Sequence, residues 1–319
     1  MGENAQKIGK KLEELGFDIL SVFNWSKKMS DKEIVCKKNA HKNEEGKKKE
    51  THGIDMYLEY EDPYIGKTQG VFIECKNRNW DGITKSKLQT WVNEEINLLE
   101  CAVNNGELSE YYAENSDRNC ALILVNCNDG KFNEAKFNEY LEQLSVPSKR
   151  TPYKIFIAGN HMLNRWDAID HMIKENYASG IEVIYPSINN SKPTNAKYWS
   201  INQLFSKYIF CQTEDIIEEA NNNERVMKYK KKLVVFFFDK ICPESFDYLW
   251  SMCRFFQYEN SHYKFDICFW TENAKDHDYI RDNFLNRIRN YDDKIDNDIA
   301  NKITVRYLLN RNVGAIDNR

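Results

Sequence analysis

The sequence lacks the features of secreted, membrane-bound and disulfide-rich proteins. Its most apolar run, Leu233 to Phe238, is far shorter than the roughly 20 residues that a membrane span needs. The first residues are polar and include no apolar segment typical of a secretory signal peptide. The nine cysteines are odd in number and include no Cys-x-x-Cys pair, which argues against a disulfide framework or a four-cysteine zinc site. We therefore expect a cytoplasmic protein with reduced thiols and no membrane association.

Two further absences restrict the function. Lys and Arg (45) nearly balance Asp and Glu (49), so any polyanionic partner has to be bound by local clusters of charge. The chain has no Gly-x-Ser-x-Gly element, and no Gly-x-Gly-x-x-Gly follows a strand in its second half. Gly66-Lys67-Thr68 resembles the end of a phosphate-binding loop, but a strand follows it where such a loop needs a helix. We therefore expect no nucleotide site there.

The length of 319 residues and the content of 41% hydrophobic and 29% charged residues predict about two globular domains. We place the first at residues 1–150 and the second at residues 151–319. In the second, helical segments separate strands expected at 153–158, 181–185, 233–238, 265–270 and 303–308. Strands that alternate with helices are typical of α/β proteins, so we expect a mainly parallel sheet in this region.

The first domain begins with a helical pattern that ends at a glycine, a common residue after a helix. Alternating apolar and polar residues then predict a β-hairpin, and an apolar stripe at helical spacing follows it. The expected elements are a helix at 5–16, a strand at 17–25, a polar loop at 26–52, hairpin strands at 54–60 and 71–76, a helix at 84–104 and a strand at 121–125.

The hairpin carries the most informative residues. An acid followed two residues later by lysine occurs five times, but only Glu74 and Lys76 end a predicted strand, where this spacing places both on one face. A turn near Tyr64 and Ile65 would bring Asp55 opposite Glu74. Two carboxylates about 5 Å apart repel by about 3 kcal/mol at an effective dielectric constant near 20. Mg²⁺ or Mn²⁺ would remove this cost and could hold water and a substrate phosphate together. The alternative is a surface salt-bridge triad in which Lys76 neutralises the acids.

These residues resemble the PD-(D/E)XK nuclease superfamily. The resemblance depends on Gly53-Ile54-Asp55, on the hairpin, and on Ile73-Glu74-Cys75-Lys76, with an amphipathic helix on either side. The resemblance covers about residues 1–130 and implies a restriction-endonuclease-like αβββαβ core. It further implies that Asp55 and Glu74 bind Mg²⁺ or Mn²⁺, with at most a main-chain carbonyl from Cys75, and that Lys76 is catalytic. Ile54 stands where the family name has proline.

Other residues could complete such a site. Members of the superfamily often place a further acid on the first helix, which Glu3 or Glu13 could supply, although a helix charge in solvent is the alternative. Gln89 resembles a polar residue that many members direct at the site, and we include it among the catalytic candidates. Ser86-x-x-Gln89 is equally a capping box. His52 could contact a phosphate or could simply be a loop histidine.

The lysine-rich segment 27–49 could contact a phosphate backbone, or it could be a solvated loop. Cys36, His41 and His52 lie in or beside this segment and are residue types that bind zinc. They have no apparent fourth partner in the sequence, so we expect no zinc site.

Two functions are consistent with these patterns. The first is a metal-dependent nuclease, acting on DNA rather than RNA and as an endonuclease rather than an exonuclease, with residues 151–319 used for assembly or recognition. The second is a catalytically inactive nuclease-fold module that binds nucleic acid or a partner protein. The intact Asp55, Glu74 and Lys76 favour the first. The opening Met1-Gly2-Glu3 and the appended α/β half also resemble the nuclease component of two-gene anti-phage systems of the GAPS group. This resemblance implies a homo-oligomer or a complex with a second defence protein.

Overall fold

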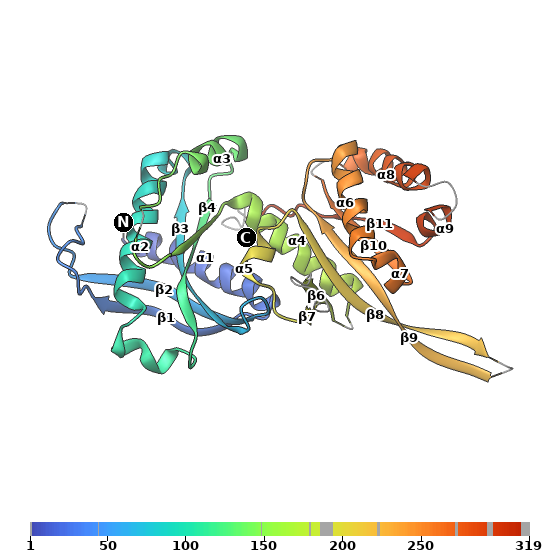
Figure 1. Ribbon diagram of the computed structural model, residues 1–319. Coiled ribbons are helices and arrows are strands. Elements are labelled where there is room, and N and C mark those ends of the chain that lie inside the picture. The colour runs from blue at the N-terminus through green and yellow to red at the C-terminus, as the bar shows by residue number, and fades with distance from the viewer. Residues whose placement is uncertain are drawn as a thin grey trace. The chain divides into compact units, whose positions relative to one another are not determined.

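The computed structural model describes residues 2–43, 45–147, 149–178, 180–185, 194–221, 224–271, 274–291 and 296–313. The chain divides into two compact units (Figure 1): Met1–Asn164 with Asn312–Arg319, and Arg165–Arg311. The boundary expected after residue 150 is too early, because strand β5 (Lys154–Ala158) pairs with β4 (Asp117–Cys127) in the sheet of the first unit. Among the described residues, no helix is long and apolar enough to cross a membrane.

The first unit contains a five-stranded sheet in the order β1-β2-β3-β4-β5. Strands β1, β2 and β3 are antiparallel, whereas β3, β4 and β5 are parallel. The other elements of this unit, in chain order, are α1 (Gly2–Val22), β1 (Ser26–Val35), β2 (Thr51–Asp62), β3 (Lys67–Arg78), η1 (Trp80–Gly82), α2 (Lys85–Ala102), η2 (Gly106–Tyr111) and α3 (Glu134–Glu142). The order α1-β1-β2-β3-α2-β4 confirms the expected αβββαβ core.

The hairpin of β2 and β3 forms as its alternating pattern predicts. Met56 pairs with Ile73 and is buried with it, and extending this register by one pair sets Asp55 opposite Glu74. On the face toward α2, Phe72 packs in one core with Leu98 and Leu99 of that helix. The acids on this face therefore lie between the sheet and α2.

Two expected elements near the N-terminus are wrong. Helix α1 continues through Gly16 to Val22, where a strand was expected. Gly16 lies inside the helix where Leu124 of β4 approaches it, so that a Cβ atom there would lie 2.6 Å from Leu124 Cδ1. Strand β1 occupies the start of the expected loop at 26–52, and its sequence gives little sign of this because only Met29 and Ile34 of the strand are buried.

The second unit contains a six-stranded sheet in the order β11-β10-β9-β8-β6-β7. Strands β9, β10 and β11 are parallel, as expected, but β8, β6 and β7 are antiparallel, so the sheet is mixed. Its strands are β6 (Glu182–Tyr185), β7 (Thr194–Ala196), β8 (Tyr208–Asn221), β9 (Glu224–Phe237), β10 (Lys264–Trp270) and β11 (Ile303–Leu308). Its helices are α4 (Asn160–Asn176, which begins in the first unit), α5 (Ile201–Leu204), α6 (Pro243–Phe255), α7 (Tyr258–Ser261), η3 (Ala274–Asp276), α8 (His277–Tyr291) and α9 (Asp296–Ala300).

Strands β8 and β9 extend beyond their sheet as a two-stranded arm (Figure 1). Strand β9 pairs with β10 only from Lys232 onward, and β8 pairs with β6 only at Cys211 and Gln212. The polar sequence of the outer half explains why the sequence pattern did not reveal β8. Apolar side chains are nevertheless exposed on the arm, including Met227 (60%) and Tyr229 (72%).

Candidate active site

Two carboxylates meet on the face of the hairpin that packs against α2. The main-chain N–H of Cys75 donates a hydrogen bond to Asp55 Oδ2 (2.7 Å), which holds the Asp55 side chain against β3. Glu74 forms an ion pair with Lys76 on the same strand face. Burial raises the pKa of both Asp55 and Glu74; at Glu74 it outweighs Lys76, which lowers the pKa, and Asp55 and Glu94 raise the pKa further. The structure thus brings together the three residues that the sequence placed on one face.

Lys76 lies among acids rather than at the protein surface. Its Nζ atom is paired with Glu74 and lies 5.9 Å from the ring centroid of Trp91 in α2. Burial opposes the charge on this ammonium group, but Glu74, Glu94 and Glu95 outweigh it and raise the pKa of Lys76. Lys76 is therefore a cation held within a cluster of carboxylates.

Glu95 of α2 is a site residue that the sequence analysis missed. Its side chain is only 3% exposed, and its Oε2 atom has no hydrogen-bond partner among the described residues. Burial, and then Glu74, raise its pKa well above the usual range. A signal was present, because Glu95 lies three residues after Val92 and four before Leu99, on the apolar stripe of the helix. A charged residue on such a stripe is unusual unless it has a partner or a role.

These groups line a pocket of about 250 Å³ between the hairpin and α2. Its walls consist of Lys49, His52, Gly53, Asp55, Glu74, Lys76, Glu94, Glu95 and Leu98. Burial lowers the pKa of His52 to about 4, so its ring is neutral. The pocket therefore contains four carboxylates near the half-buried Lys76, with Lys49 at its border.

Two acids of α1, Glu13 and Glu3, were proposed as further site residues, and the structure describes the side chain of Glu13 alone. Glu13 is half-buried, and its pKa is raised to about 7 by burial and then by Asp55 and Asp31. It lines a separate pocket with Lys10, Lys27 and Asp31 rather than the pocket under α2. The side chain of Glu3 lies outside the described residues. Glu13 is thus close enough to influence the acids of the hairpin without lining their pocket.

The structure does not bring Gln89 to this site. Its amide oxygen accepts from Ser145 N (2.9 Å), and its amide nitrogen donates to Ser145 O (2.8 Å). The capping-box interpretation is also wrong, because α2 is capped by Thr84, whose side chain accepts from Lys87 N. Gln89 fastens the segment after α3 to α2, and its assignment as a catalytic residue is corrected accordingly.

We therefore expect Gln89→Ala to leave the rate of nucleic-acid cleavage within about twofold of the parent. The substitution removes three hydrogen bonds at a partly exposed site, two to Ser145 and one to Asn93, which costs about 1–2 kcal/mol of stability. Initial cleavage rates and thermal unfolding of the two proteins measure both effects. A rate loss without a loss of stability would return Gln89 to the catalytic set.

Cys75 contributes through its backbone. Its N–H group positions Asp55, and burial followed by Asp55 and Glu74 raises the pKa of its thiol, so the thiol stays protonated. A protonated thiol is a poor metal ligand. The metal-binding role of the Cys75 carbonyl stays a prediction.

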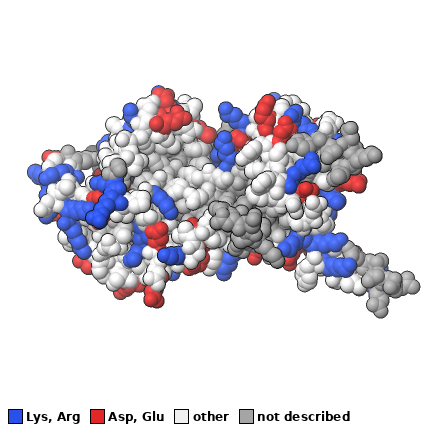
Figure 2. All heavy atoms as spheres, in the orientation of Figure 1, with Lys and Arg blue, Asp and Glu red and all other residues white. Residues whose placement is uncertain are grey.

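Lysines also lie near the acidic pocket along α2. A second pocket of about 400 Å³ is lined by Lys42, Lys149 and Glu94, and Glu94 also lines the acidic pocket. Lys42 belongs to the loop between β1 and β2, the part of the first unit where Figure 2 shows Lys and Arg side chains gathered. The two pockets thus form neighbouring acidic and basic sites along α2.

Comparison with known families agrees with this arrangement. Residues 1–162 match the model of the GAPS4 protein PD-(D/E)XK nuclease domain. The chain belongs to this nuclease family. The match ends two residues before the boundary of the first unit at Asn164 and includes every strand of the first sheet. No curated protein matches the chain.

Proposed function

We propose that this GAPS4-family chain is an active, metal-dependent nuclease that hydrolyses phosphodiester bonds. The observation that carries the proposal is the shared pocket under α2, in which Asp55, Glu74 and Glu95 surround Lys76. A surface salt-bridge triad, the alternative considered from the sequence, would not need a third carboxylate buried in an apolar helix face. DNA is the substrate that we propose from the restriction-endonuclease-like fold, with endonucleolytic cleavage.

The donor set fits Mg²⁺ or Mn²⁺. Asp55 and Glu74 would hold the cation, Glu95 offers a buried oxygen that lacks a hydrogen-bond partner among the described residues, and Cys75 could add its carbonyl. All of these ligands are oxygen atoms, which these hard cations prefer. When bound, the cation would polarise the scissile phosphate and lower the pKa of a coordinated water.

The residues of the chain have separable roles in this proposal. Asp55 is fixed by the Cys75 N–H group, so one metal-binding carboxylate is positioned before any ligand arrives. Lys76 is placed by its ion pair with Glu74 to donate to an oxygen of the reacting phosphate. Lys49, Lys42 and Lys149 border the two pockets and would contact flanking phosphates, which fixes position without reading sequence.

A cleavage assay with metal control tests this function. The full-length protein is incubated with closed circular plasmid, linear DNA and RNA, each with Mg²⁺, with Mn²⁺ or with chelator. We expect DNA cleavage that chelator abolishes and added Mg²⁺ or Mn²⁺ restores, and nicking of the closed circle identifies an endonuclease. Binding of nucleic acid without cleavage under every condition would favour the inactive module instead, and cleavage of RNA alone would overturn the choice of substrate.

We also propose that the protein acts in anti-phage defence and that residues 151–319 serve assembly or recognition. Family membership supports the first statement, and the exposed apolar side chains on the β8–β9 arm support the second. The plating efficiency of phage on cells that express the complete system, compared with the same system carrying Glu74→Ala, tests the defence role.

The arm allows a separate prediction. Paired substitutions Met227→Asp and Tyr229→Asp are expected to weaken self-association or binding of the partner by about tenfold or more, because buried aromatic anchors dominate interface energies. Tyr279→Asp on α8, another exposed tyrosine of the same unit, is the matched control. Multi-angle light scattering measures self-association of each protein alone. The same measurement in the presence of the second defence protein measures binding of that partner. If the doubly substituted variant assembles as the parent does, the β8–β9 arm takes no part in self-association or partner binding.

A further inference from the structure

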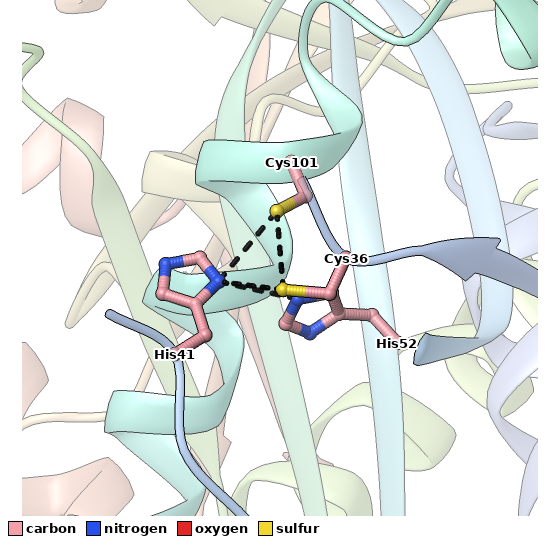
Figure 3. A group of neighbouring side chains, drawn as sticks. All are labelled: Cys36, His41, His52 and Cys101. Carbon is pink, nitrogen blue, oxygen red and sulfur yellow. Dashed lines mark hydrogen bonds between the residues drawn. The ribbon is translucent and has the colours of Figure 1, made fainter. Parts of the chain in front are cut away.

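Four side chains with metal-binding atoms meet at one buried point beside the acidic pocket, whose wall includes one of them, His52 (Figure 3). Cys36 follows β1, His41 lies in the lysine-rich loop, His52 begins β2, and Cys101 is in the last turn of α2. Each side chain is at most 4% exposed. One ligand atom from each lies within 4.8 Å of the others. The region from the end of β1 to the start of β2, together with the distant helix α2, thus places two sulfur and two nitrogen atoms together.

Four of the six distances among these atoms are close to the edges of a zinc tetrahedron, and the other two are at most 4.8 Å. Zn–S bonds of about 2.3 Å and Zn–N bonds of about 2.0 Å place two sulfurs about 3.8 Å apart, sulfur and nitrogen about 3.5 Å apart, and two nitrogens about 3.3 Å apart. The two sulfurs are 4.0 Å apart, and His41 Nδ1 lies 3.3 Å from Cys36 Sγ and 3.6 Å from Cys101 Sγ. His41 Nδ1 and His52 Nε2 are 3.3 Å apart.

Hydrogen bonding alone does not account for this arrangement. His41 Nδ1 faces three neighbours at once, namely both sulfurs and the His52 nitrogen. An imidazole nitrogen carries either one proton or one lone pair, so it can satisfy only one of these contacts fully. A cation at the centre would instead accept one lone pair from each of the four atoms.

The opposite side of His41 is also arranged as in metal sites. Its Nε2 atom lies 2.8 Å from Glu100 Oε2, and a hydrogen bond there places the ring proton on Nε2 and leaves the lone pair on Nδ1. Glu100 is in turn paired with Lys38 and Lys149, each at 3.2 Å. A carboxylate that orients a metal-binding histidine is a common outer partner of zinc.

We propose that Cys36, His41, His52 and Cys101 bind one Zn²⁺ ion as a structural site. Four protein ligands fill the tetrahedral shell and leave no position for substrate, which distinguishes a structural from a catalytic zinc. Thiolate and imidazole ligands select zinc over the hard cations of the acidic pocket. Binding releases the two thiol protons to solvent. The expectation from the sequence that no fourth ligand exists is thereby corrected, because Cys101 of α2 supplies it.

The site would fasten the lysine-rich loop to the nuclease core. The loop closes through Cys36 N to Glu50 O (2.7 Å) and Lys49 N to His41 O (2.8 Å), both beside the proposed ligands. Lys49 also lines the acidic pocket. Zinc would therefore hold Lys49 at the border of the acidic pocket, even though the lysines of the loop repel one another. That this pocket is the active site rests on the proposed nuclease function.

Metal analysis of the full chain tests the site independently of nuclease activity. We expect about one zinc ion per chain after purification under reducing conditions and dialysis. Cys36→Ser and Cys101→Ser should each retain at least about tenfold less zinc. Cys120→Ser and Cys253→Ser, which alter buried cysteines elsewhere, are the matched controls and should retain it. Glu74→Ala should lose cleavage but keep zinc, which separates failure of this site from failure of the proposed function.

Cobalt replacement provides a second measurement that needs no variant to fold. Protein produced with Co²⁺ should show the intense visible bands of a tetrahedral thiolate site, and added Zn²⁺ should remove them. Absence of stoichiometric metal in the unmodified chain would overturn the proposal. Equal zinc in Cys101→Ser and Cys120→Ser would overturn it as well, and so would a Cys36–Cys101 disulfide found by non-reducing peptide mass analysis of freshly prepared protein.

Discussion

Replacement of Lys76 by alanine is expected to slow DNA cleavage by about 10²-fold or more, because removing one positioned donor to a developing negative charge typically has this effect. Lys76 is the cation paired with Glu74 in the pocket under α2, and its substitution leaves the carboxylates to repel one another. Initial rates at saturating Mg²⁺ measure the loss.

Lys136→Ala provides the control for this experiment. Lys136 follows Glu134 at the same spacing of two residues, but it lies exposed on α3 and pairs with Glu139 at 2.7 Å. Its replacement should leave the cleavage rate unchanged. Thermal unfolding of both variants separates catalytic from structural loss, and a Lys76→Ala protein that cuts as fast as the parent would show that the lysine has no catalytic role.

Replacement of Gly70 by alanine is expected to lower the free energy of unfolding by about 3 kcal/mol, the upper part of the range for overpacked cores. A Cβ atom at Gly70 of β3 would lie 1.9 Å from Tyr57 Oη, and Tyr57 is fully buried beneath it. The tyrosine cannot move away easily because its hydroxyl donates to Glu59 Oε1 at 2.9 Å.

Urea denaturation followed by tryptophan fluorescence measures this change. Gly106→Ala is the matched control, because nothing lies within 4 Å of a Cβ atom built there and the backbone is not in the left-handed region. The control should unfold within about 0.5 kcal/mol of the parent. Equal stability of the two alanine variants would show that the Tyr57 side chain can shift at little cost. The close approach of Gly70 and Tyr57 would then not contribute to stability.

The parts of the fold that the sequence predicted are those whose pattern is local. The alternation of Met56 and Leu58 with polar residues determined the hairpin and its register, and the apolar stripe through Leu88 and Leu99 determined α2. Both patterns arise because one face of the element is buried and the other is not. Such elements can be read from a short window of sequence.

The parts that escaped prediction depend on distant contacts. Gly16 looks like a helix end in isolation, but it lies inside α1, at a point where Leu124 of β4 approaches it closely. Strand β1 pairs along one edge with β2 and buries few side chains, so its lysines resemble those of a loop. The outer half of β8 is stabilised mainly by β9, and its polar residues carry no apolar alternation.

The candidate site shows the same division. Asp55, Glu74 and Lys76 could be grouped from the sequence because a hairpin fixes which residues share a face. Glu95 belongs to another element, and its proximity depends on how α2 packs on the sheet. Cys101 lies on that helix too, far in sequence from the other proposed zinc ligands. When helix–sheet packing brings residues together, they have no fixed spacing in the sequence, so sequence patterns cannot predict that they meet.

The position of β3 at the middle of its sheet has a consequence for how the site moves. β3 pairs with β2 up to Ile73, and its ladder with β4 continues past Glu74 and Lys76 to Arg78, so the backbone of these two site residues is held by β4. Amide hydrogens in such a strand exchange only through large-scale opening, whereas those of loops exchange through local fluctuations. Charge repulsion at Glu74 is therefore opposed by a backbone that does not fray, and substrate or ion binding meets a Glu74 and a Lys76 that are already positioned.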